Sequence, residues 1–476
     1  MDFPTAAKDP TRGAGGRTWL PSIGDAPAPL YAAIVDALAR DIGGGLLTPG
    51  QRLPTHRELA KALGTSVGTV TRAYLEAERR GLIQSRVGRG TFIRDYTDWD
   101  SYSPMVDRRR IDLGPMAVPA VPGDPGHGAL ATALARLSAR ADLVALSGYQ
   151  EHGGTVEQRE AGVRWLALSG VSAPVGEVSV CAGAQHATSV LLGMLASGAG
   201  VLVEELSYSG VLNAAKQLRL PTHPVAMDGE GLVPEALGDA AVRSGAKVLY
   251  CTPTHHNPTG IVTPLRRREA IVRVCRDHDL TIIENSALSP LAATPPPPLA
   301  ALAPERTCYI ASLSKATVPA LRVGYIRSPP ALAERVDLAI GGSIWSMSPL
   351  LAEIATTWIE EGTAEALLDA RRAEAAARQA IAAEVLRAHG AAEGGESYFL
   401  WLPLPDDRSA LEVVEEAASR HVLIGPAHTF AVRPGNAPNA VRLSLGAPRS
   451  REELVQGLRI LSEILDEDPR PRRRGF

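Results

Sequence analysis

The stretch that decides the fold is ASLSKATVPALRVG, residues 311–324, in which one lysine stands among small and hydroxyl-bearing residues. Tyr309–Ala311 has the apolar character of a buried strand end, and the chain turns away from it at Ser312–Lys315. Arg322 follows the lysine by seven residues. A lysine at a strand end, near hydroxyls and an arginine, can form a Schiff base while its neighbours hold a phosphate. A lysine solvated in an ordinary turn is the alternative, and the rest of the chain has to decide between them.

Short apolar runs alternate with helical segments along the chain on both sides of this stretch. The runs that read as buried strands are Val178–Cys181, Val201–Glu204, Lys247–Thr252, Leu280–Glu284 and Thr307–Ala311. Helical stretches such as Ala187–Leu195 and Pro264–Asp277 lie between them. This alternation predicts an α/β fold in which helices cover a parallel sheet and ligands bind beyond the carboxyl ends of the strands.

Polar and small residues follow several of these predicted strands. A turn of small residues that could receive a phosphate on its backbone N–H groups opens a helix, and a tyrosine, an amide and the lysine loop follow other strands. The candidate residues are Gly183, Ala184, Gln185, Tyr208, Asn257, Ser312, Ser314, Lys315 and Arg322. One lysine, one arginine, a phosphate turn, a stacking ring and an amide together suit pyridoxal 5′-phosphate.

Charge separates a small basic module from the rest of the chain. The net charge is −3, but residues 30–94 hold ten Lys or Arg against five Asp or Glu, so this segment carries +5 and the remainder −8. The imbalance favours a nucleic-acid partner for the small module alone. Nothing resembles a transmembrane run or a secretory signal, and four widely spaced cysteines fit a reducing cytoplasm, so we expect a cytoplasmic protein without a membrane partner.

The basic module has the pattern of a winged helix-turn-helix. Leu30–Asp41 is helical, Thr55 and Glu58 have capping-box spacing at the start of a second helix, and Gly64 ends that helix. A third helix, Val67–Arg80, is followed by a predicted hairpin whose tip carries Arg86 and Arg89. Such a module places its third helix in the major groove and its wing on phosphates or in the minor groove.

The sequence LPTHRELAKALGTSVGTVTRAYLEAERRGLIQSRVGRGTF resembles the winged helix-turn-helix of GntR-type bacterial regulators. The resemblance implies operator DNA as a partner and contacts from Thr55, Arg57, Ser66, Thr69, Arg72, Arg86 and Arg89. Val67 departs from it, because many relatives have an arginine there, and its apolar side chain suits a thymine methyl instead. A helix-turn-helix used for protein contacts is the alternative.

The strand-end constellation resembles fold-type I aminotransferases, and its fusion to the DNA-binding module resembles MocR-type regulators. By this resemblance Lys315 forms the Schiff base, Asn257 bonds the ring hydroxyl and Tyr208 stacks on the ring. Arg322, Ser312 and the turn at Gly183–Gln185 hold the phosphate, and Arg442 accepts the carboxylate of an amino-acid-like effector. Tyr149 reaches the phosphate of the partner subunit's site in a homodimer.

The chain departs from the aminotransferase pattern at two positions after the strand LTII. Asn285 stands where an aspartate pairs with the pyridine nitrogen, and Leu288 where a tyrosine bonds the ring hydroxyl. Without the aspartate's charge the ring is a weaker electron sink, so turnover should be slow. A body that holds the cofactor and senses an amine is therefore favoured over one that no longer holds it, and a working aminotransferase with a DNA-binding appendage is the rival.

These patterns divide the chain into five parts. Residues 1–27 form an N-terminal extension, 28–94 the DNA-binding module and 95–110 a polar linker. Residues 111–465 form the aminotransferase-like body, with a large α/β domain, a long Ala-rich helix near 365–387 and a smaller C-terminal α/β lobe. Residues 466–476 form a basic tail. Two adjacent histidines, His255 and His256, face opposite ways on a strand, so no metal site is expected there.

Overall fold

The structure, a computed structural model, describes residues 19–23, 29–43, 46–48, 50–86, 90–93, 110–123, 125–139, 144–391 and 395–467. The chain divides into two compact units, one made of residues 1–103 with the short segment 434–436 and the other of the remaining residues. The predicted linker up to residue 109, Arg89 and the tail from residue 468 lie outside the described residues.

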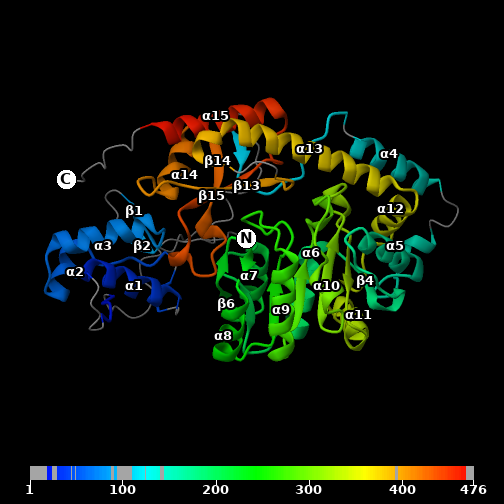
Figure 1. Ribbon diagram of the computed structural model, residues 1–476, viewed down its shortest axis with the longest axis horizontal. Helices are drawn as coiled ribbons and strands as arrows, with labels where there is room; N and C mark the ends of the chain where they lie inside the picture. The colour runs from blue at the N-terminus through cyan, green and yellow to red at the C-terminus, as the bar shows by residue number, and fades with distance from the viewer. Residues whose placement is uncertain are drawn as a thin grey trace, which may run out of the picture. The chain divides into compact units, whose positions relative to one another are not determined.

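The first unit contains three helices and a two-stranded hairpin (Figure 1). They are α1 (Leu30–Gly43), α2 (His56–Leu63), α3 (Val67–Arg79), β1 (Ile83–Arg86) and β2 (Gly90–Ile93). The buried side chains of α1 and α3, including Ile34, Leu38 and Val70, form one core with the hairpin. The antiparallel strands pair from Ile83 with Ile93 to Arg86 with Gly90, which is the predicted wing.

Both short helices of this unit begin and end where the sequence signals them. Thr55 and Glu58 form a reciprocal capping box, with the Glu58 N–H 3.3 Å from the Thr55 hydroxyl and the Thr55 N–H 2.8 Å from the Glu58 carboxylate. Gly64 ends α2 in the left-handed conformation at φ 62°. Ser66 caps α3 by accepting from the Thr69 N–H. The helix-turn-helix geometry is therefore set by local chemistry.

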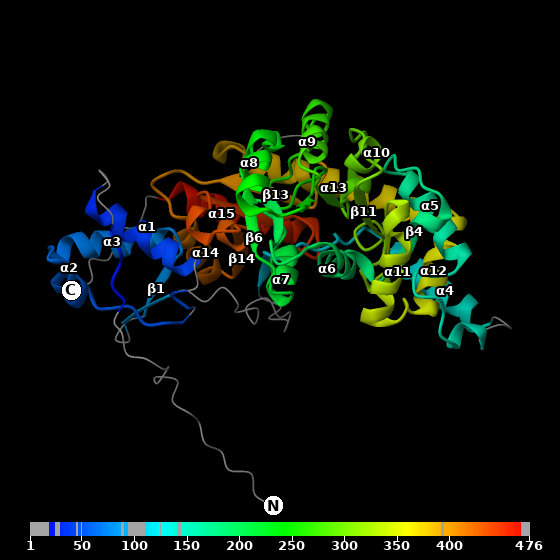
Figure 2. The same cartoon turned by 90° about the horizontal axis from the view of Figure 1, so that it is seen from below.

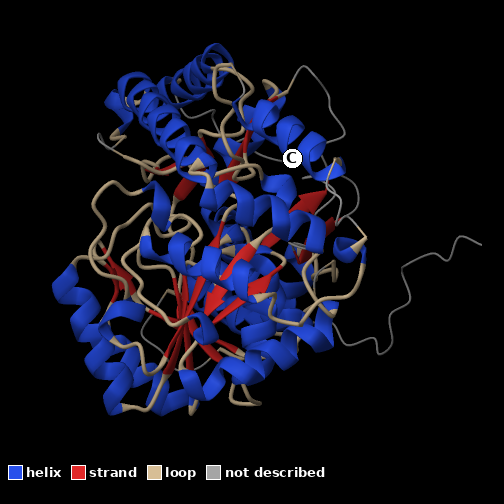
Figure 3. Ribbon diagram, turned by 90° about the vertical axis from the view of Figure 1, so that its right-hand side faces the viewer, coloured by secondary structure: helices blue, strands red, loops and turns tan. Residues whose placement is uncertain are grey.

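The second unit is built on a seven-stranded sheet in the order β4-β12-β11-β10-β9-β5-β6. Its strands are β4 (Val178–Cys181), β5 (Val201–Glu204), β6 (Thr222–Val225), β9 (Val248–Cys251), β10 (Thr281–Asn285), β11 (Thr307–Ser312) and β12 (Gly324–Arg327). Adjacent side chains of β5 pack into different hydrophobic clusters, Leu202 into one and Val203 into the other. This alternation is expected for a sheet with helices on both faces, and Figure 3 shows the strands between such helices.

The sheet is mixed, as expected for a large mixed or parallel α/β domain, and one strand gives it this character. Strand β12 runs antiparallel to both β11 and β4. It follows the lysine loop directly, and a connection of only eleven residues from Leu313 to Val323 is too short for a helical crossover to a parallel neighbour. The other six strands share one direction, so their carboxyl ends still meet at one edge.

The helices of the large domain cover the sheet in sequence order. They are α5 (Val156–Ala167), α6 (Gly183–Leu195), α7 (Ser209–Gln217), α8 (Pro234–Ser244), α9 (Leu265–Asp277), α10 (Leu299–Leu302) and α11 (Pro330–Ile344). Helix α6 begins four residues before the predicted start at Ala187, so the small-residue turn forms its first turn. Helix α12 (Pro349–Glu360) packs on α5 and on α4 (Pro125–Ser138), and the three lie on the same side of the large domain in Figures 1 and 2.

A smaller lobe completes this unit. Its four-stranded sheet has the order β13-β15-β14-β3, with β3 (Ile111–Leu113), β13 (Phe399–Pro403), β14 (Val422–Pro426) and β15 (Ala440–Ser444). Helices α14 (Ala410–Ser419) and α15 (Arg451–Asp466) pack on it, and the short β7 (Met227–Asp228) and β8 (Gly231–Leu232) pair in the large domain. The long helix α13 (Thr363–Val385) reaches from α12 to α15 and so joins the domain to the lobe (Figure 1).

Within the described ranges, no helix has both the length and the apolar character needed to cross a membrane.

Candidate functional site

The candidate site lies at the edge of the large sheet where the parallel strands end. Ser312 is the last residue of β11 and Asn285 the last of β10, while Gly183 opens α6 immediately after β4. Tyr208 follows β5 and Asn257 follows β9 by a short loop each. Residues far apart in the sequence therefore converge because the strands that precede them are neighbours and point the same way.

Lys315 lies half-buried on a loop that is fixed by hydrogen bonds. The Lys315 carbonyl accepts from the Tyr398 hydroxyl at 2.6 Å, and its Nζ donates to the Met116 carbonyl at 3.3 Å. Burial and, to a smaller extent, the nearby charges of Arg322 and Arg442 together lower the pKa of the Lys315 ammonium to about 8. About one tenth of the lysine is consequently the neutral, nucleophilic amine at pH 7.

An anion cradle lies next to the lysine loop. Helix α6 starts at Gly183, which has φ 80°, and a Cβ at this position would lie 3.4 Å from an Nη of Arg322. The exposed Arg322 side chain therefore faces the positive N-terminus of a 13-residue helix. The Ser314 hydroxyl is buried and has no hydrogen-bond partner among the described residues. Two positive groups and an unpaired hydroxyl beside a glycine backbone fit a phosphate.

The residues around the expected ring position are an aromatic pair and an amide. Asn285 donates from Nδ2 to the Tyr250 hydroxyl at 2.6 Å, and its Oδ1 accepts from the Ala287 N–H at 3.2 Å. Burial raises the pKa of Tyr208, so its ring stays neutral. Leu288 is buried in a hydrophobic cluster and brings no hydroxyl to this place. The residue predicted to meet the ring nitrogen of a bound cofactor is therefore an uncharged amide that is hydrogen-bonded to Tyr250 and Ala287.

Arg442 of β15 supplies a buried cation on the other side of the site. It is only 5% exposed, and it donates to Asn257 Oδ1 at 2.9 Å and to the Gly114 carbonyl at 2.6 Å. Its guanidinium carbon lies 4.5 Å from the centre of the Phe430 ring. Two oxygen acceptors already hold the planar fork, which is the geometry that also accepts a carboxylate.

The remaining turn residues support the cradle. Gln185 donates to the Gly210 carbonyl at 2.9 Å, and a Cβ on Gly210 would clash with the Tyr208 ring. Ala184 lies in the first turn of α6 between Gly183 and Gln185. The structure thus brings together eleven of the twelve predicted cofactor and effector residues, and the Ser312 hydroxyl accepts from the Ser314 N–H at 3.2 Å.

Tyr149 is not part of this cluster in its own chain. It is 89% exposed, and its ring centre lies 5.6 Å from that of Trp345, which is itself 53% exposed. His152 contacts the same indole edge-on and its Nδ1 lies 2.9 Å from the Trp345 carbonyl. The three side chains form an aromatic surface patch.

The predicted DNA contacts of the first unit fall into two groups. Thr55 and Ser66 cap helices, and Thr69 shares a 2.9 Å hydrogen bond with Ser66, so these hydroxyls shape the ends of the helices. Arg57 is exposed on α2, and Arg72 lies 4.0 Å above the Tyr31 ring. Arg86 is the last residue of β1, and Arg89 lies outside the described residues.

Sequence reasoning missed five participants. They are Tyr250, Tyr398, Phe430 and the backbone carbonyls of Gly114 and Met116. A tyrosine close to the end of a buried strand was a readable signal for Tyr250. The carbonyls had none, because any residue supplies one.

A winged helix-turn-helix and a lysine-centred phosphate site on an aminotransferase-like sheet define a DNA-binding protein with a cofactor-type body. Residues 30–93 match the bacterial regulatory proteins of the gntR family, and residues 117–461 match aminotransferase class I and II. The chain belongs to the GntR-type transcriptional regulators that carry an aminotransferase-like domain, the MocR type.

Individual relatives agree with both halves. The HTH-type transcriptional regulator YdeF of Bacillus subtilis is 30% identical over 94% of this chain and 97% of its own. The vitamin B6 salvage pathway transcriptional repressor PtsJ of Salmonella typhimurium is 29% identical over 78% of this chain and 84% of its own. An archaeal alanine:glyoxylate aminotransferase shares the fold, with a TM-score of 0.69 and 22% identity over 82% of this chain and 97% of that one.

Pyridoxal 5′-phosphate is the cofactor of this architecture, and the residues present fit it. The cradle at Gly183 and Arg322 suits its phosphate, and Lys315 suits its aldehyde. When bound, the group supplies an electron-withdrawing ring that activates an attached amine.

Proposed function

We propose that this regulator binds pyridoxal 5′-phosphate through Lys315 and responds to a small amine that carries a carboxylate, with little or no turnover. The observation that carries the proposal is the combination of an activated lysine with an uncharged ring partner. Lys315 has a pKa lowered to about 8, as attachment requires, whereas Asn285 contributes no charge to the ring nitrogen. A body built in this way can hold the cofactor and lacks the usual means of driving carbanion chemistry.

Arg442 supports the assignment of the effector class. A buried guanidinium held by two neutral oxygens gains from exchanging one of them for a carboxylate, because charge-assisted bidentate pairs are stronger. Lys315 and Arg442 lie close enough for the arginine to act on the lysine's pKa. An α-amino acid presents an amine and a carboxylate at such a short spacing.

A homodimer and a cytoplasmic location complete the proposal. Tyr149 and Trp345 expose aromatic surface without a role in their own subunit, as expected of a patch that meets another copy. Two copies would also present two recognition helices to operator half-sites. A regulator that reads chromosomal DNA acts in the bacterial cytoplasm.

The test is the absorbance of the purified protein in the presence of pyridoxal 5′-phosphate. A yellow complex that borohydride bleaches is expected, and Lys315→Ala should abolish it whereas Lys216→Ala, at an exposed lysine, should not. Titration with a panel of amino acids should then change both the spectrum and the affinity for a duplex selected from random DNA. A protein that stays colourless, or multiple-turnover transamination at enzyme-like rates, would refute the proposal.

A further inference from the structure

A segment that precedes α4, Gly114–Ala120, crosses the candidate site and contacts its two cations through backbone carbonyls, while the side chains of Met116 and Val118 pack against the neighbouring hydrophobic cluster. We call this segment the strap. At its front end the Gly114 carbonyl accepts from Arg442 at 2.6 Å, and two residues on the Met116 carbonyl accepts from Lys315 at 3.3 Å. The strap is therefore hydrogen-bonded to both of the cations that the proposed ligands need, Arg442 and Lys315.

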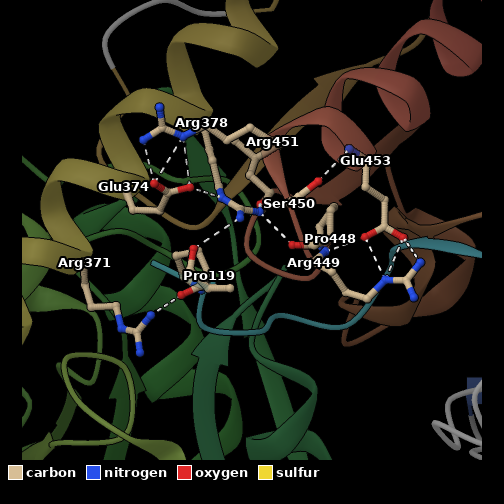
Figure 4. Close-up of polar contacts among 11 residues, drawn as sticks. Pro119, Arg371, Glu374, Arg378, Pro448, Arg449, Ser450, Arg451 and Glu453 are labelled. Carbon is tan, nitrogen blue, oxygen red and sulfur yellow. Dashed lines mark hydrogen bonds and ion pairs between the residues drawn. The ribbon is translucent and has the colours of Figure 1, made fainter. Parts of the chain in front are cut away.

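The rear end of the strap is held by a different pair of cations, both on α13. Arg371 donates to the Pro119 carbonyl, and Arg378 donates to the Ala120 carbonyl at 3.4 Å (Figure 4). Arg378 is itself fixed by a 2.7 Å ion pair with Glu374, in which both side chains are 2% exposed. This rear anchor belongs to the packed interior and serves no proposed ligand.

Two further contacts limit where the strap can move. Before it, β3 pairs in register with β14, Ile111 opposite Val422. Behind Met116, the Ala117 carbonyl lies so close to Gly446 that a Cβ there would clash with it. The part that can leave the site without unfolding the lobe is consequently the short piece from Gly114 to Met116.

We propose that the strap is an internal competitor: its Gly114 carbonyl holds Arg442 until the carboxylate of a ligand displaces it. The inference rests on the proposed function of Arg442 as the carboxylate site. A carboxylate offers two charged oxygens to the guanidinium of Arg442, whereas the carbonyl offers one neutral oxygen. The carboxylate therefore forms the stronger hydrogen bonds and displaces the carbonyl. The strap is also the part of the site that is closest to the linker in sequence. Its release would therefore couple ligand binding to a movement of the backbone near the linker.

Hydrogen–deuterium exchange of the full-length protein tests the ligand-free half of the proposal. Arg442→Gln removes the donor of the Gly114 carbonyl, so the amides of the strap should exchange at least about tenfold faster, as expected for the loss of a hydrogen bond from a charged donor. Arg243→Gln, at an exposed arginine on α8 of the same unit, is the matched control and should leave strap exchange unchanged. Equal strap exchange in wild type and Arg442→Gln would overturn the proposal even if no ligand ever bound.

The ligand half compares two stable compounds that differ by a carboxylate-bearing arm. Both N-(5′-phosphopyridoxyl)-L-leucine and pyridoxamine 5′-phosphate fill the phosphate and ring positions, but only the first reaches Arg442. We expect the first compound to speed up the exchange of the strap amides and the second to leave their exchange rate unchanged. Strap protection by both compounds, with saturable binding shown by calorimetry, would overturn the competitor. Absence of binding by both would instead refute the proposed function, and the Arg442→Gln comparison would still decide the strap.

Discussion

The titration of Lys315 offers a direct test of how the site is built. Burial is the largest cause of its lowered pKa, and the charges of Arg322 and Arg442 add to it. At pH 7 a lysine with a pKa of about 8 is about 9% neutral, compared with about 0.03% at the ordinary value of 10.5, so its reactivity should rise about 300-fold. The neutral amine is the only form that attacks an electrophile.

Competitive acetylation with a trace of acetic anhydride, followed by mass spectrometry, measures this fraction at each pH. The Lys315 peptide should show an inflection near pH 8, and the peptide of the exposed Lys216 provides an internal reference for reagent decay. The shape of the profile is compared rather than the absolute rate, because a half-buried amine is reached more slowly.

Removing one charged neighbour separates the causes. Arg442→Gln should move the inflection to higher pH, but it should stay below 10.5, since burial remains and is the larger cause. An inflection above pH 10 in the wild-type protein would show that Lys315 is solvated and would remove the argument for attachment. An inflection that does not move in the variant would show that Arg442 lies too far away to act on the lysine.

Four other changes test separate parts of the molecule. Asn285→Asp should speed the half-reaction with an amino acid at least tenfold, roughly the effect of one pKa unit on the ring nitrogen, in stopped-flow absorbance; an unchanged rate would mean that Asn285 does not face that nitrogen. Replacing thymine by uracil in a selected duplex removes the methyl that Val67 is expected to contact, so wild-type binding should weaken by about 0.8 kcal/mol per contacted methyl. The affinity of the Val67→Arg variant, measured in the same way by fluorescence anisotropy, should be equal for the two duplexes. Tyr149→Ala should lower the affinity for pyridoxamine 5′-phosphate while the fold is retained, and equal calorimetric affinities would exclude its role in a partner's site. Glu374→Gln should cost about 3–5 kcal/mol of stability, because it leaves the buried Arg378 without its anion; an unaltered urea midpoint would contradict this.

Much of the fold was predictable from local signals. The capping box at Thr55, the stop at Gly64 and the apolar runs of β4 and β5 are properties of a few adjacent residues, and the structure has these elements at the expected places. The antiparallel strand β12 was missed because its four residues, GYIR, carry no alternation that distinguishes it from a turn. Its direction follows from the short loop around Lys315, which is a consequence of pairing and not of composition.

The candidate site was predictable where a side chain carries the chemistry. Lys315, Arg322 and Arg442 were identified from residue type and position after strands, and the structure places the two arginines near enough to lower the pKa of Lys315. The partners of these cations were not predictable, because Gly114 and Met116 act through carbonyls that every residue has. Such contacts depend on the path of the backbone, which only the folded chain defines.

The carbonyls of the strap also bear on why a sensor and an enzyme with the same fold differ. Two cations in a poorly solvated site repel each other, and the lowered pKa of Lys315 reflects that repulsion together with burial. The Gly114 and Met116 carbonyls give both cations an acceptor, which lowers the cost of burying these charges. A regulator has to persist in both states, because a ligand shifts an equilibrium only if it binds the two arrangements unequally. The uncharged Asn285 and the hydrogen-bonded Arg442 therefore both support the proposal that the site holds its ligands reversibly, with little turnover.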